Sequence, residues 1–401
     1  MGVERKGLMS MNASRFEGEF GASDGRRLLE VRAPGRTELA GNHTDHEGGS
    51  VIAGAVNRYV EGLFSPSESD VMRVSSEGYG LVEVRTNSLE PRNDERGTTA
   101  SLVRGMAAQF ARKGIDVRGF DAAIRSDVMG GSGLSSSAAF ELELGQAMNA
   151  LWANGSLAAD ELALMAQRAE REWFGKPCGL MDQAAVALGG IQHMDFGDAS
   201  RLKAERLDFD FAACGYAVCI VAVGADHAAN IDDYAAVPAE MQSVARMMGK
   251  GILSEVPAAE VLAALPRIRR ELGDRAALRA LHYYNEEILV SERAEALRAG
   301  DMSSFLLLTR RSGASSAMLL QNVSVGGACD QPSMLAIALA EALLAGRGAA
   351  RVHGGGFGGT IQAFVPLDLI DAFSSGMDAV FGQGACGAYG IDHEGARARW
   401  M

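Results

Sequence analysis

Residues 130–141 combine glycine and serine in a pattern that suits the binding of an anion. They read GGSGLSSSAAFE, with three consecutive serines directly before a run of good helix formers. Glycines let successive backbone N–H groups converge, and a helix N-terminus adds partial positive charge, so such a loop can hold a phosphate. The serines could instead only cap the helix, and this stretch alone leaves both interpretations open. It matches neither the G-x-S-x-G nucleophile elbow nor a P-loop.

A second stretch, residues 33–49, gathers polar side chains directly after an expected strand. It reads APGRTELAGNHTDHEGG and contains Arg36, Asn42, His43 and Asp45. Loops at strand ends often carry ligand-binding groups, although a solvated turn would also explain this composition. A metal site on the histidines is not favoured, because no third histidine or cysteine stands nearby at a suitable spacing.

Two further stretches carry candidate groups for chemistry. Residues 174–185, FGKPCGLMDQAA, place Asp182 about one turn into an expected helix, where it could also merely complement the helix dipole. Glu170 lies upstream near the end of another helix, a position at which charges usually face solvent. Residues 350–360, ARVHGGGFGGT, are glycine-dense, which suggests backbone packed close to a ligand or another loop.

Strands and helices that would position these stretches alternate along the chain. Apolar periodicity, together with glycine and proline breaks, predicts the following elements. We expect strand, loop and strand over 28–68, strands over 71–86, 120–128 and 216–225, and helices over 98–113, 137–152, 158–175, 179–190, 226–250, 257–300 and 301–320. The last glycine-dense stretch is expected to join a late helix to a strand. This order predicts an α+β fold with two domains, residues 1–210 and 211–401.

Composition limits the partners. The 401 residues carry a formal net charge of −13, which disfavours broad attraction to nucleic acid or an anionic membrane. Five cysteines without metal-binding spacing indicate free thiols in a reducing compartment. The N-terminal residues lack a signal-peptide core, and the longest apolar run, 216–225, is about half of a membrane span. We therefore expect a cytoplasmic protein.

Taken together, these stretches resemble the GHMP superfamily of small-molecule kinases. Three superfamily motifs occur in the expected order, at 33–49, 130–141 and 351–360, and CGLMDQ at 178–183 is a signature of the galactokinase family within it. The resemblance implies a two-lobed fold with the active site in the cleft between the domains. It also implies ATP and Mg²⁺ as cofactors and phosphorylation of a sugar at its C1 hydroxyl, most simply α-D-galactose.

The resemblance assigns roles residue by residue. Asp182 would face the anomeric hydroxyl as general base or electrostatic partner, and Arg36 would lower the pKa of Asp182 and stabilise the transferring phosphoryl group. The sugar would be bound by Asn42, His43, Asp45, Gly179 and Tyr234. The phosphate loop would comprise Gly131, Gly133, Leu134, Ser135, Ser136 and Ser137. Mg²⁺ would be held by Ser137 and Glu170.

One departure bears on the substrate. Galactokinases usually carry glutamate where this chain has Asn42, and in that family the glutamate binds the C6 hydroxyl of the sugar. A 1-kinase for N-acetylgalactosamine, arabinose or a uronic acid is therefore an alternative, and so is a non-catalytic sensor of sugar and ATP. The expected partners are a small-molecule sugar and ATP, with no nucleic acid or membrane, and the protein is expected to be a monomer or weak homo-oligomer.

Overall fold

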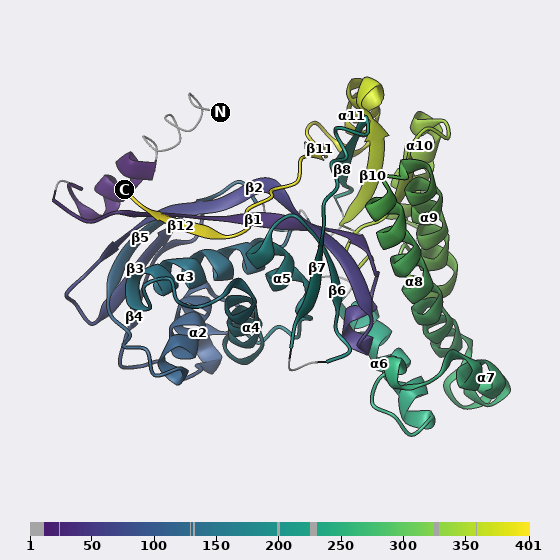
Figure 1. Cartoon of the computed structure of the whole chain (residues 1–401), viewed down its shortest axis with the longest axis horizontal. Coiled ribbons are helices and arrows are strands. Elements are labelled where there is room, and N and C mark those ends of the chain that lie inside the picture. Colours follow the sequence, from purple (N-terminus) through teal and green to yellow (C-terminus); the bar gives the residue numbers. More distant parts are fainter. Residues whose placement is uncertain are drawn as a thin grey trace.

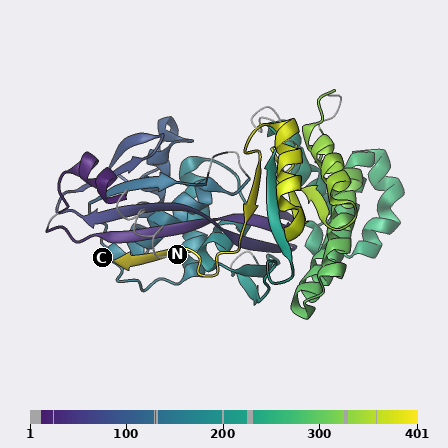
Figure 2. The same cartoon turned by 90° about the horizontal axis from the view of Figure 1, so that it is seen from above.

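The protein forms two lobes, each built around its own β-sheet (Figures 1 and 2). The computed structural model describes residues 12–23, 25–128, 130, 133–198, 201–224, 231–324, 329–357 and 359–401. A helix over 12–20 precedes the first strand. Gly131, one of the expected phosphate-loop residues, lies outside the described residues.

The first lobe contains an eight-stranded sheet in the order β12-β1-β2-β5-β3-β4, with β6 paired to β2 and β7 to β6. Only the β3–β5 pair is parallel among the pairings of this sheet. The long strand β2 pairs with β6 through its first residues and with β5 through its last. The strands are β1 (Leu29–Ala40), β2 (Ser50–Pro66), β3 (Val71–Ser76), β4 (Gly80–Arg85), β5 (Phe120–Ser126), β6 (Ile191–Asp195), β7 (Lys203–Leu207) and β12 (Arg397–Trp400).

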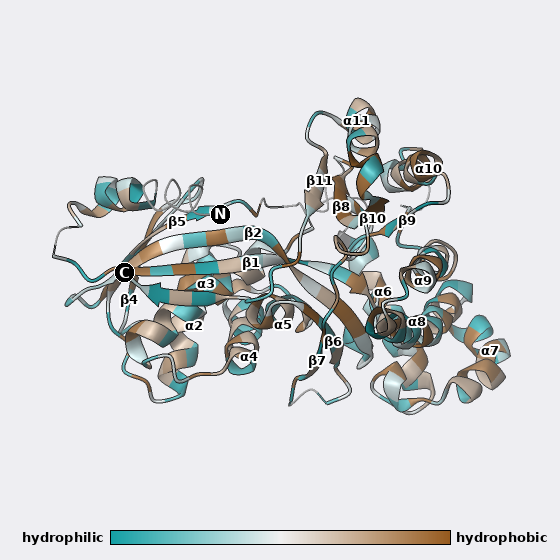
Figure 3. Cartoon of the chain, turned by 45° about the horizontal axis from the view of Figure 1, so that its top comes forward, coloured by the Kyte–Doolittle hydropathy of each residue, from teal (hydrophilic) through white to brown (hydrophobic). Residues whose placement is uncertain are grey.

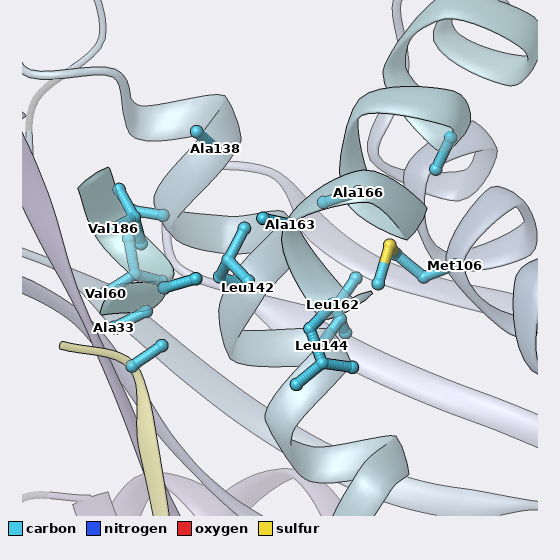
Figure 4. Packing of buried hydrophobic residues seen from close by; sticks show 14 of the residues in the cluster. Ala33, Val60, Met106, Ala138, Leu142, Leu144, Leu162, Ala163, Ala166 and Val186 are labelled. Carbon is cyan, nitrogen blue, oxygen red and sulfur yellow. The ribbon is translucent and has the colours of Figure 1, made fainter. Parts of the chain in front are cut away.

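Helices pack on one side of this sheet (Figure 1). They are α2 (Thr99–Arg112), α3 (Ser136–Trp152), α4 (Ala159–Ala169) and α5 (Met181–Leu188). Helix α4 rests on the other helices rather than on the strands. Met106, Leu142, Leu162 and Val186 interlock beneath the strands (Figure 4). Burying an aliphatic side chain of this size contributes about 1.5–3 kcal/mol, so this core fixes α3 and α5, whose first turns carry the candidate site.

The second lobe contains a four-stranded antiparallel sheet in the order β11-β8-β10-β9. Side chains of β8 and β10 are largely hydrophobic (Figure 3), as expected for strands covered on both faces. The strands are β8 (Tyr216–Ala222), β9 (Ala349–Val352), β10 (Thr360–Pro366) and β11 (Cys386–Tyr389). The helices are α6 (Ile231–Met247), α7 (Ala258–Leu272), α8 (Asp274–Ala299), α9 (Met302–Ser315), α10 (Pro332–Leu344) and α11 (Ile370–Phe381).

The architecture confirms an α+β fold but corrects three local expectations. Residues 71–86 form a hairpin of β3 and β4 rather than one strand, because Gly78 and Gly80 turn the chain with φ of 81° and 75°. Residues 257–300 form two helices, separated at Gly273 with φ 91°. The glycine-dense stretch near 353–359 joins strand β9 to strand β10, not a helix to a strand.

The last strand returns to the first lobe. The chain passes from the first sheet to the second between β7 and β8, but β12 pairs antiparallel with β1, from Leu29 opposite Trp400 to Arg32 opposite Arg397. The two lobes are therefore connected twice by the chain (Figure 2). Within the described ranges, no helix is both long and apolar enough to cross a bilayer.

Candidate active site

The loop that carries the three serines, here called the serine loop and described for residues 133–137, leads into α3 through a strained turn. No serine side chain caps the helix at Ser135. Gly133 has φ 74° and Ser135 has φ 57°, a left-handed conformation that is uncommon for serine. The Ser135 hydroxyl makes no capping bond to the helix backbone and instead donates to Oδ2 of Asp182. The capping interpretation is therefore wrong for this serine. Ser136 and Ser137 form the first turn of α3, and both are half-buried.

Asp182 is held between the loop and strand β1. It lies in the first turn of α5, with its side chain 25% exposed, and its Oδ1 accepts from Nε of Arg36 at 2.6 Å. Arg36 also donates through Nη1 to the carbonyl of Gly133, and its backbone N–H donates to the carbonyl of Leu134 at 3.0 Å. Arg36 therefore holds both the serine loop and Asp182, the candidate base, in position.

These contacts set the charge of Asp182. Burial alone would raise the pKa of Asp182, but the Arg36 guanidinium and the hydrogen bonds from Arg36 and Ser135 outweigh burial and hold the pKa below its ordinary value. Burial raises the pKa of Asp45, and the neighbouring Asp182 carboxylate adds to that rise. Two adjacent carboxyl groups are therefore driven in opposite directions, a pattern typical of sites that use them for different purposes.

Glu170 and Ser137 meet on the other side of the loop. Helix α4 continues into a π-helical turn, Glu170–Phe174, and π-turns of this kind often occur at functional sites. This turn places Glu170 in the interior, where Oε1 accepts from the Ser137 hydroxyl at 2.9 Å and Oε2 from Nε2 of Gln183 at 2.8 Å. Glu172 instead faces solvent and pairs with Arg112 at 2.8 Å. The expectation that a charge at this position faces solvent is therefore wrong for Glu170.

The oxygen donors here suit Mg²⁺ bound together with a nucleotide. Mg²⁺ is usually held by one or two carboxylates, with phosphate oxygens and water completing its shell. Ser137 and Glu170 supply a hydroxyl and a carboxylate, and buried Oε1 of Glu141 beside them has no hydrogen-bond partner among the described residues. No cluster of three or more histidine, cysteine, aspartate or glutamate side chains arranged for a metal occurs in the described part of the chain.

The loop after β1 carries the candidate sugar-binding groups. Its 3₁₀ turn, Asp45–Glu47, brings Asp45 against Gly179, where any side chain would collide with the Asp45 carboxylate. His43 has φ 61° and its ring contacts that of Tyr234, with centroids 5.4 Å apart. Burial lowers the pKa of His43 to about 3, so His43 is neutral, and its Nε2 lies 2.9 Å from the carbonyl of Gly355. Tyr234, on α6, is 49% exposed.

Asn42 differs from these neighbours because its side chain is wholly enclosed. Its exposure is 0%, and its Nδ2 donates to Oε1 of Glu38 at 3.2 Å and to the carbonyl of Gly354 at 2.6 Å. Its Oδ1 accepts from Asn322 at 2.7 Å and from Ser316 at 3.3 Å. Every donor and acceptor of this amide is therefore used within the protein. Asn42 organises the loop in this structure and leaves no polar atom free for a sugar hydroxyl.

The glycine-dense turn of the second lobe packs directly on the serine loop of the first. A side chain at Gly133 would place Cβ 2.6 Å from Oγ1 of Thr360 and 2.9 Å from Nδ1 of His353. His353 is buried, and its Nε2 accepts from the backbone N–H of Glu38 at 3.3 Å. Burial, with the nearby Arg36 and Arg351, lowers the pKa of His353 well below its ordinary value, so it is neutral. The two lobes meet at these loops.

The structure brings the sequence-predicted residues together in two groups. In the first group, Asp182 contacts Arg36 and Ser135, and Glu170 contacts Ser137 of the same loop. The neighbouring group contains His43, Asp45, Gly179 and Tyr234. Sequence reasoning missed the residues that hold these groups in place. They are Glu38, Glu141, Lys176, Gln183, Asn322, Arg351, His353 and Thr360. Several of these residues lie within the motifs quoted above, and their place in a motif is the sequence signal that could have identified them.

Comparison with known proteins supports a common origin with sugar kinases. Residues 101–190 match the model of the GHMP kinases N terminal domain, and residues 14–66 match the galactokinase galactose-binding signature. The galactokinase of Streptomyces coelicolor is 32% identical over 357 residues, 87% of each chain, and that of Glaesserella parasuis is 28% identical over 91% of each.

Solved structures extend the comparison to the fold. The structure of Lactococcus lactis galactokinase complexed with galactose superposes with a TM-score of 0.82 at 24% identity, over 97% of this chain and 99% of that one. A mevalonate kinase superposes with a TM-score of 0.65 at 15% identity, over 91% of this chain and 99% of the other. The fold is thus shared across the GHMP kinases, and the sequence identity sustained along nearly the whole chain makes this protein a member of the galactokinase family.

Proposed function

We propose that this sugar kinase transfers the γ-phosphoryl group of ATP to the C1 hydroxyl of α-D-galactose, giving α-D-galactose 1-phosphate and ADP. The observation that carries the proposal is the position of Asp182, whose carboxylate touches both Arg36 and the serine loop and lies beside Asp45 and Gly179. A single group therefore borders both the phosphate side and the sugar side. The galactokinase relatives and the galactose-binding signature at 14–66 support galactose as the sugar.

In the proposed reaction, Asp182 and Arg36 have different roles. The C1 oxygen would attack the γ-phosphorus while the bond from phosphorus to the β,γ-bridging oxygen breaks, and Asp182 would take the hydroxyl proton or stabilise its departure to solvent. Because the pKa of Asp182 is held low, its carboxylate is ionised at neutral pH and available for this role. Arg36 would lie close enough to neutralise charge on the transferring group. Phosphoryl transfer depends chiefly on such alignment and charge stabilisation.

The serine loop would supply the nucleotide side. We assign the phosphate contacts to backbone N–H groups at residues 131–137 and the metal contacts to Ser137 and Glu170, which already share a hydrogen bond of 2.9 Å. Mg²⁺ bound there would neutralise charge on the nucleotide phosphates. The positive end of α3, Ser136–Trp152, points at the same loop and favours an anion at that place.

The sugar side would consist of His43, Asp45, Gly179 and Tyr234. Asp45 can accept hydrogen bonds from a sugar, and Tyr234, half of whose surface is exposed, carries a hydroxyl that can do so as well. Both ring nitrogens of His43 already lie within 3.1 Å of protein atoms, so His43 would exchange one of these contacts for a sugar hydroxyl. Since Asn42 is enclosed and fully hydrogen-bonded, its substitution for glutamate is explained by the buried network around Glu38. The departure from the family pattern at Asn42 therefore argues less strongly for another sugar than the sequence alone suggests.

We also propose a division of the chain into two domains. A division into domains at residues 1–210 and 211–401 is supported by the change of sheet between β7 and β8, with β12 as the segment that returns. The active site would lie between the two lobes, where Gly133 meets His353 and Thr360. We propose a cytoplasmic enzyme that acts as a monomer or weak homo-oligomer.

A panel of sugars tests the proposed reaction. Purified protein would be incubated with ATP, Mg²⁺ and one of galactose, N-acetylgalactosamine, arabinose, galacturonic acid or glucose, and ADP release would be measured. We expect the highest kcat/KM with galactose and loss of turnover in Asp182→Asn. Faster turnover of another sugar would replace the substrate, and binding of sugar and ATP without ADP release would reject the kinase activity.

A further inference from the structure

Lys176 occupies an unusual place beside the candidate metal carboxylate. It follows the π-helical turn directly after Gly175, which has φ 87°. Its side chain is 51% exposed, yet its ammonium lies 3.0 Å from Oε1 of Glu170, whose side chain is 2% exposed. A solvent-accessible cation is thus paired with a buried anion.

The pairing uses the oxygen that faces the serine loop. Oε1 of Glu170 accepts from both Ser137, at 2.9 Å, and Lys176, whereas Oε2 is taken by Gln183. Because Ser137 and Lys176 contact the same atom, the ammonium lies beside the first turn of α3. Its charge also lowers the pKa of Asp182, which places Lys176 within electrostatic reach of the candidate base. A lysine ammonium is positively charged at neutral pH, so its contact with Glu170 is an ion pair.

Two cations cannot share this oxygen without strong repulsion. If Mg²⁺ is held by Ser137 and Glu170, the divalent ion replaces the ammonium at Oε1, since a carboxylate favours the higher charge. Glu170 is fixed by Gln183 and cannot follow, whereas the lysine side chain has four rotatable carbons and half of its surface in solvent. The ammonium must then find another anion close to its starting point, and phosphate oxygens held by the serine loop are the anions that arrive with the metal.

We propose that Lys176 is a further catalytic residue, which neutralises Glu170 before nucleotide binds and contacts an oxygen of the transferring phosphoryl group once Mg²⁺ occupies Glu170. The proposal rests on the Mg²⁺- and ATP-dependent function proposed above. In this proposal two positively charged side chains, Arg36 and Lys176, act at the site and have separate roles. Arg36 is engaged with Asp182 on the acceptor side, and Lys176 serves the metal side, where negative charge accumulates during transfer.

Three variants test the role of this lysine. Lys176→Met removes the charge and keeps much of the side-chain volume, Lys176→Arg keeps a cation, and Lys113→Met is the matched control because Lys113 pairs with Glu161 on the surface at 2.6 Å, on another part of the first lobe. Binding of Mn²⁺ to each protein, alone and with ADP, would be measured by electron paramagnetic resonance, and kcat and both KM values would be measured with Mg²⁺.

We expect Lys176→Met to bind Mn²⁺ several-fold more tightly than the wild type, because no ammonium competes for Glu170. Its kcat should fall by at least about tenfold with the KM for sugar nearly unchanged, while Lys176→Arg regains much of the kcat. An unchanged Mn²⁺ affinity, or an unchanged kcat, would each overturn the proposal. The Mn²⁺ titration involves no sugar, so failure of the wild type to phosphorylate galactose would reject the proposed function separately. Thermal unfolding of all variants checks that each is folded.

Discussion

Asp182 owes its proposed role to its neighbours more than to its own position in a helix. An aspartate in the first turn of any helix is common, and here the contacts from Arg36 and Ser135 are what keep it ionised. Replacing Asp182 with asparagine keeps the shape of the side chain and removes its basicity. We expect kcat to fall by about 10²- to 10⁴-fold while ADP binding, measured by calorimetry, stays within about twofold. Retention of most of the kcat would remove Asp182 from the mechanism.

The hydrogen bond from the Ser135 hydroxyl to Asp182 leads to a prediction about how activity depends on pH. Its hydrogen bond stabilises the charged form of Asp182, so Ser135→Ala should raise the pKa of Asp182. Since the ionised carboxylate is the active form, the acid limb of kcat/KM should move to higher pH in this variant. Ser136→Ala is the control, because its loss affects the same loop without touching Asp182. Superimposable acid limbs for the wild type and Ser135→Ala would contradict this account.

The Asn42–Glu38 contact can be tested by exchanging the amide and the carboxylate. Asn42→Asp places an anion opposite Oε1 of Glu38 and the carbonyl of Gly354, so we expect lower thermal stability and a KM for sugar raised by about tenfold. Glu38→Gln combined with Asn42→Asp restores one donor and one acceptor with the same total charge. The double variant should recover part of both losses, with a coupling of roughly 0.5–3 kcal/mol from the thermodynamic cycle. Strict additivity of the two changes would refute a direct contact.

At the scale of elements, the site depends on how closely the serine loop and the glycine turn approach. Gly133→Ala introduces both a disfavoured φ and a collision with Thr360 and His353. Gly155→Ala has nearly the same φ, 73°, with nothing within 4 Å, and so isolates the backbone strain of about 1–2 kcal/mol. We expect Gly133→Ala alone to raise the KM for ATP, by about tenfold or more, and to lose more stability in urea unfolding than the control. Equal effects of both variants would show that the approach of the loops is unimportant.

The elements carrying the motifs were predictable because their signals are local. Helix α2 begins after its N-cap Thr98 and α3 begins at Ser136, within the run of serines and one residue before the expected start, as apolar periodicity and turn residues indicate. The break at Gly273 and the hairpin at Gly78 were missed although glycines marked both places, because periodicity on either side outweighed them. The π-turn after α4 could not be predicted, since it differs from an α-helix in hydrogen-bond register and not in residue pattern.

Contacts between distant elements were beyond the sequence for a different reason. Glu170 resembles any helix-end charge until the fold places Ser137, Lys176 and Gln183 around it. Asn42 looks like an exposed loop residue until Asn322 and Gly354 close over it. The spacing of residues along the sequence does not show which distant side chains come into contact in the fold. Family resemblance named the residues that we propose to contact substrate, but the contacts of the residues that support them are visible only in three dimensions.

At the scale of the whole molecule, the first lobe contains a buried carboxyl group that should make its stability depend on pH. Glu143 of α3 is fully buried, and neither of its oxygens has a hydrogen-bond partner among the described residues. Burial, assisted by Glu61, raises the pKa of Glu143 well above its ordinary value. The folded state therefore holds a proton that the unfolded chain releases at lower pH, so stability is lost as pH rises from the unfolded value toward the folded one.

Glu143→Gln removes this titration without changing the side-chain shape. We expect the variant and the wild type to have similar Tm values near pH 5, and the variant to be the more stable of the two at pH 8–9. Differential scanning calorimetry across this range provides the measurement. A difference in Tm that does not change with pH would mean that Glu143 is already ionised in the folded protein across this range, so that burial does not raise its pKa.

The return of β12 to β1 has a consequence for how the protein is made. The edge of β1, Leu29–Ala40, receives its partner, Arg397–Trp400, only after the ribosome has synthesised the second lobe, which lies between the two strands in the sequence. Until β12 has emerged from the ribosome, that edge presents unpaired backbone groups to other nascent or unfolded chains. The sheet of the first lobe is thus begun before the second lobe is synthesised and is completed only after it.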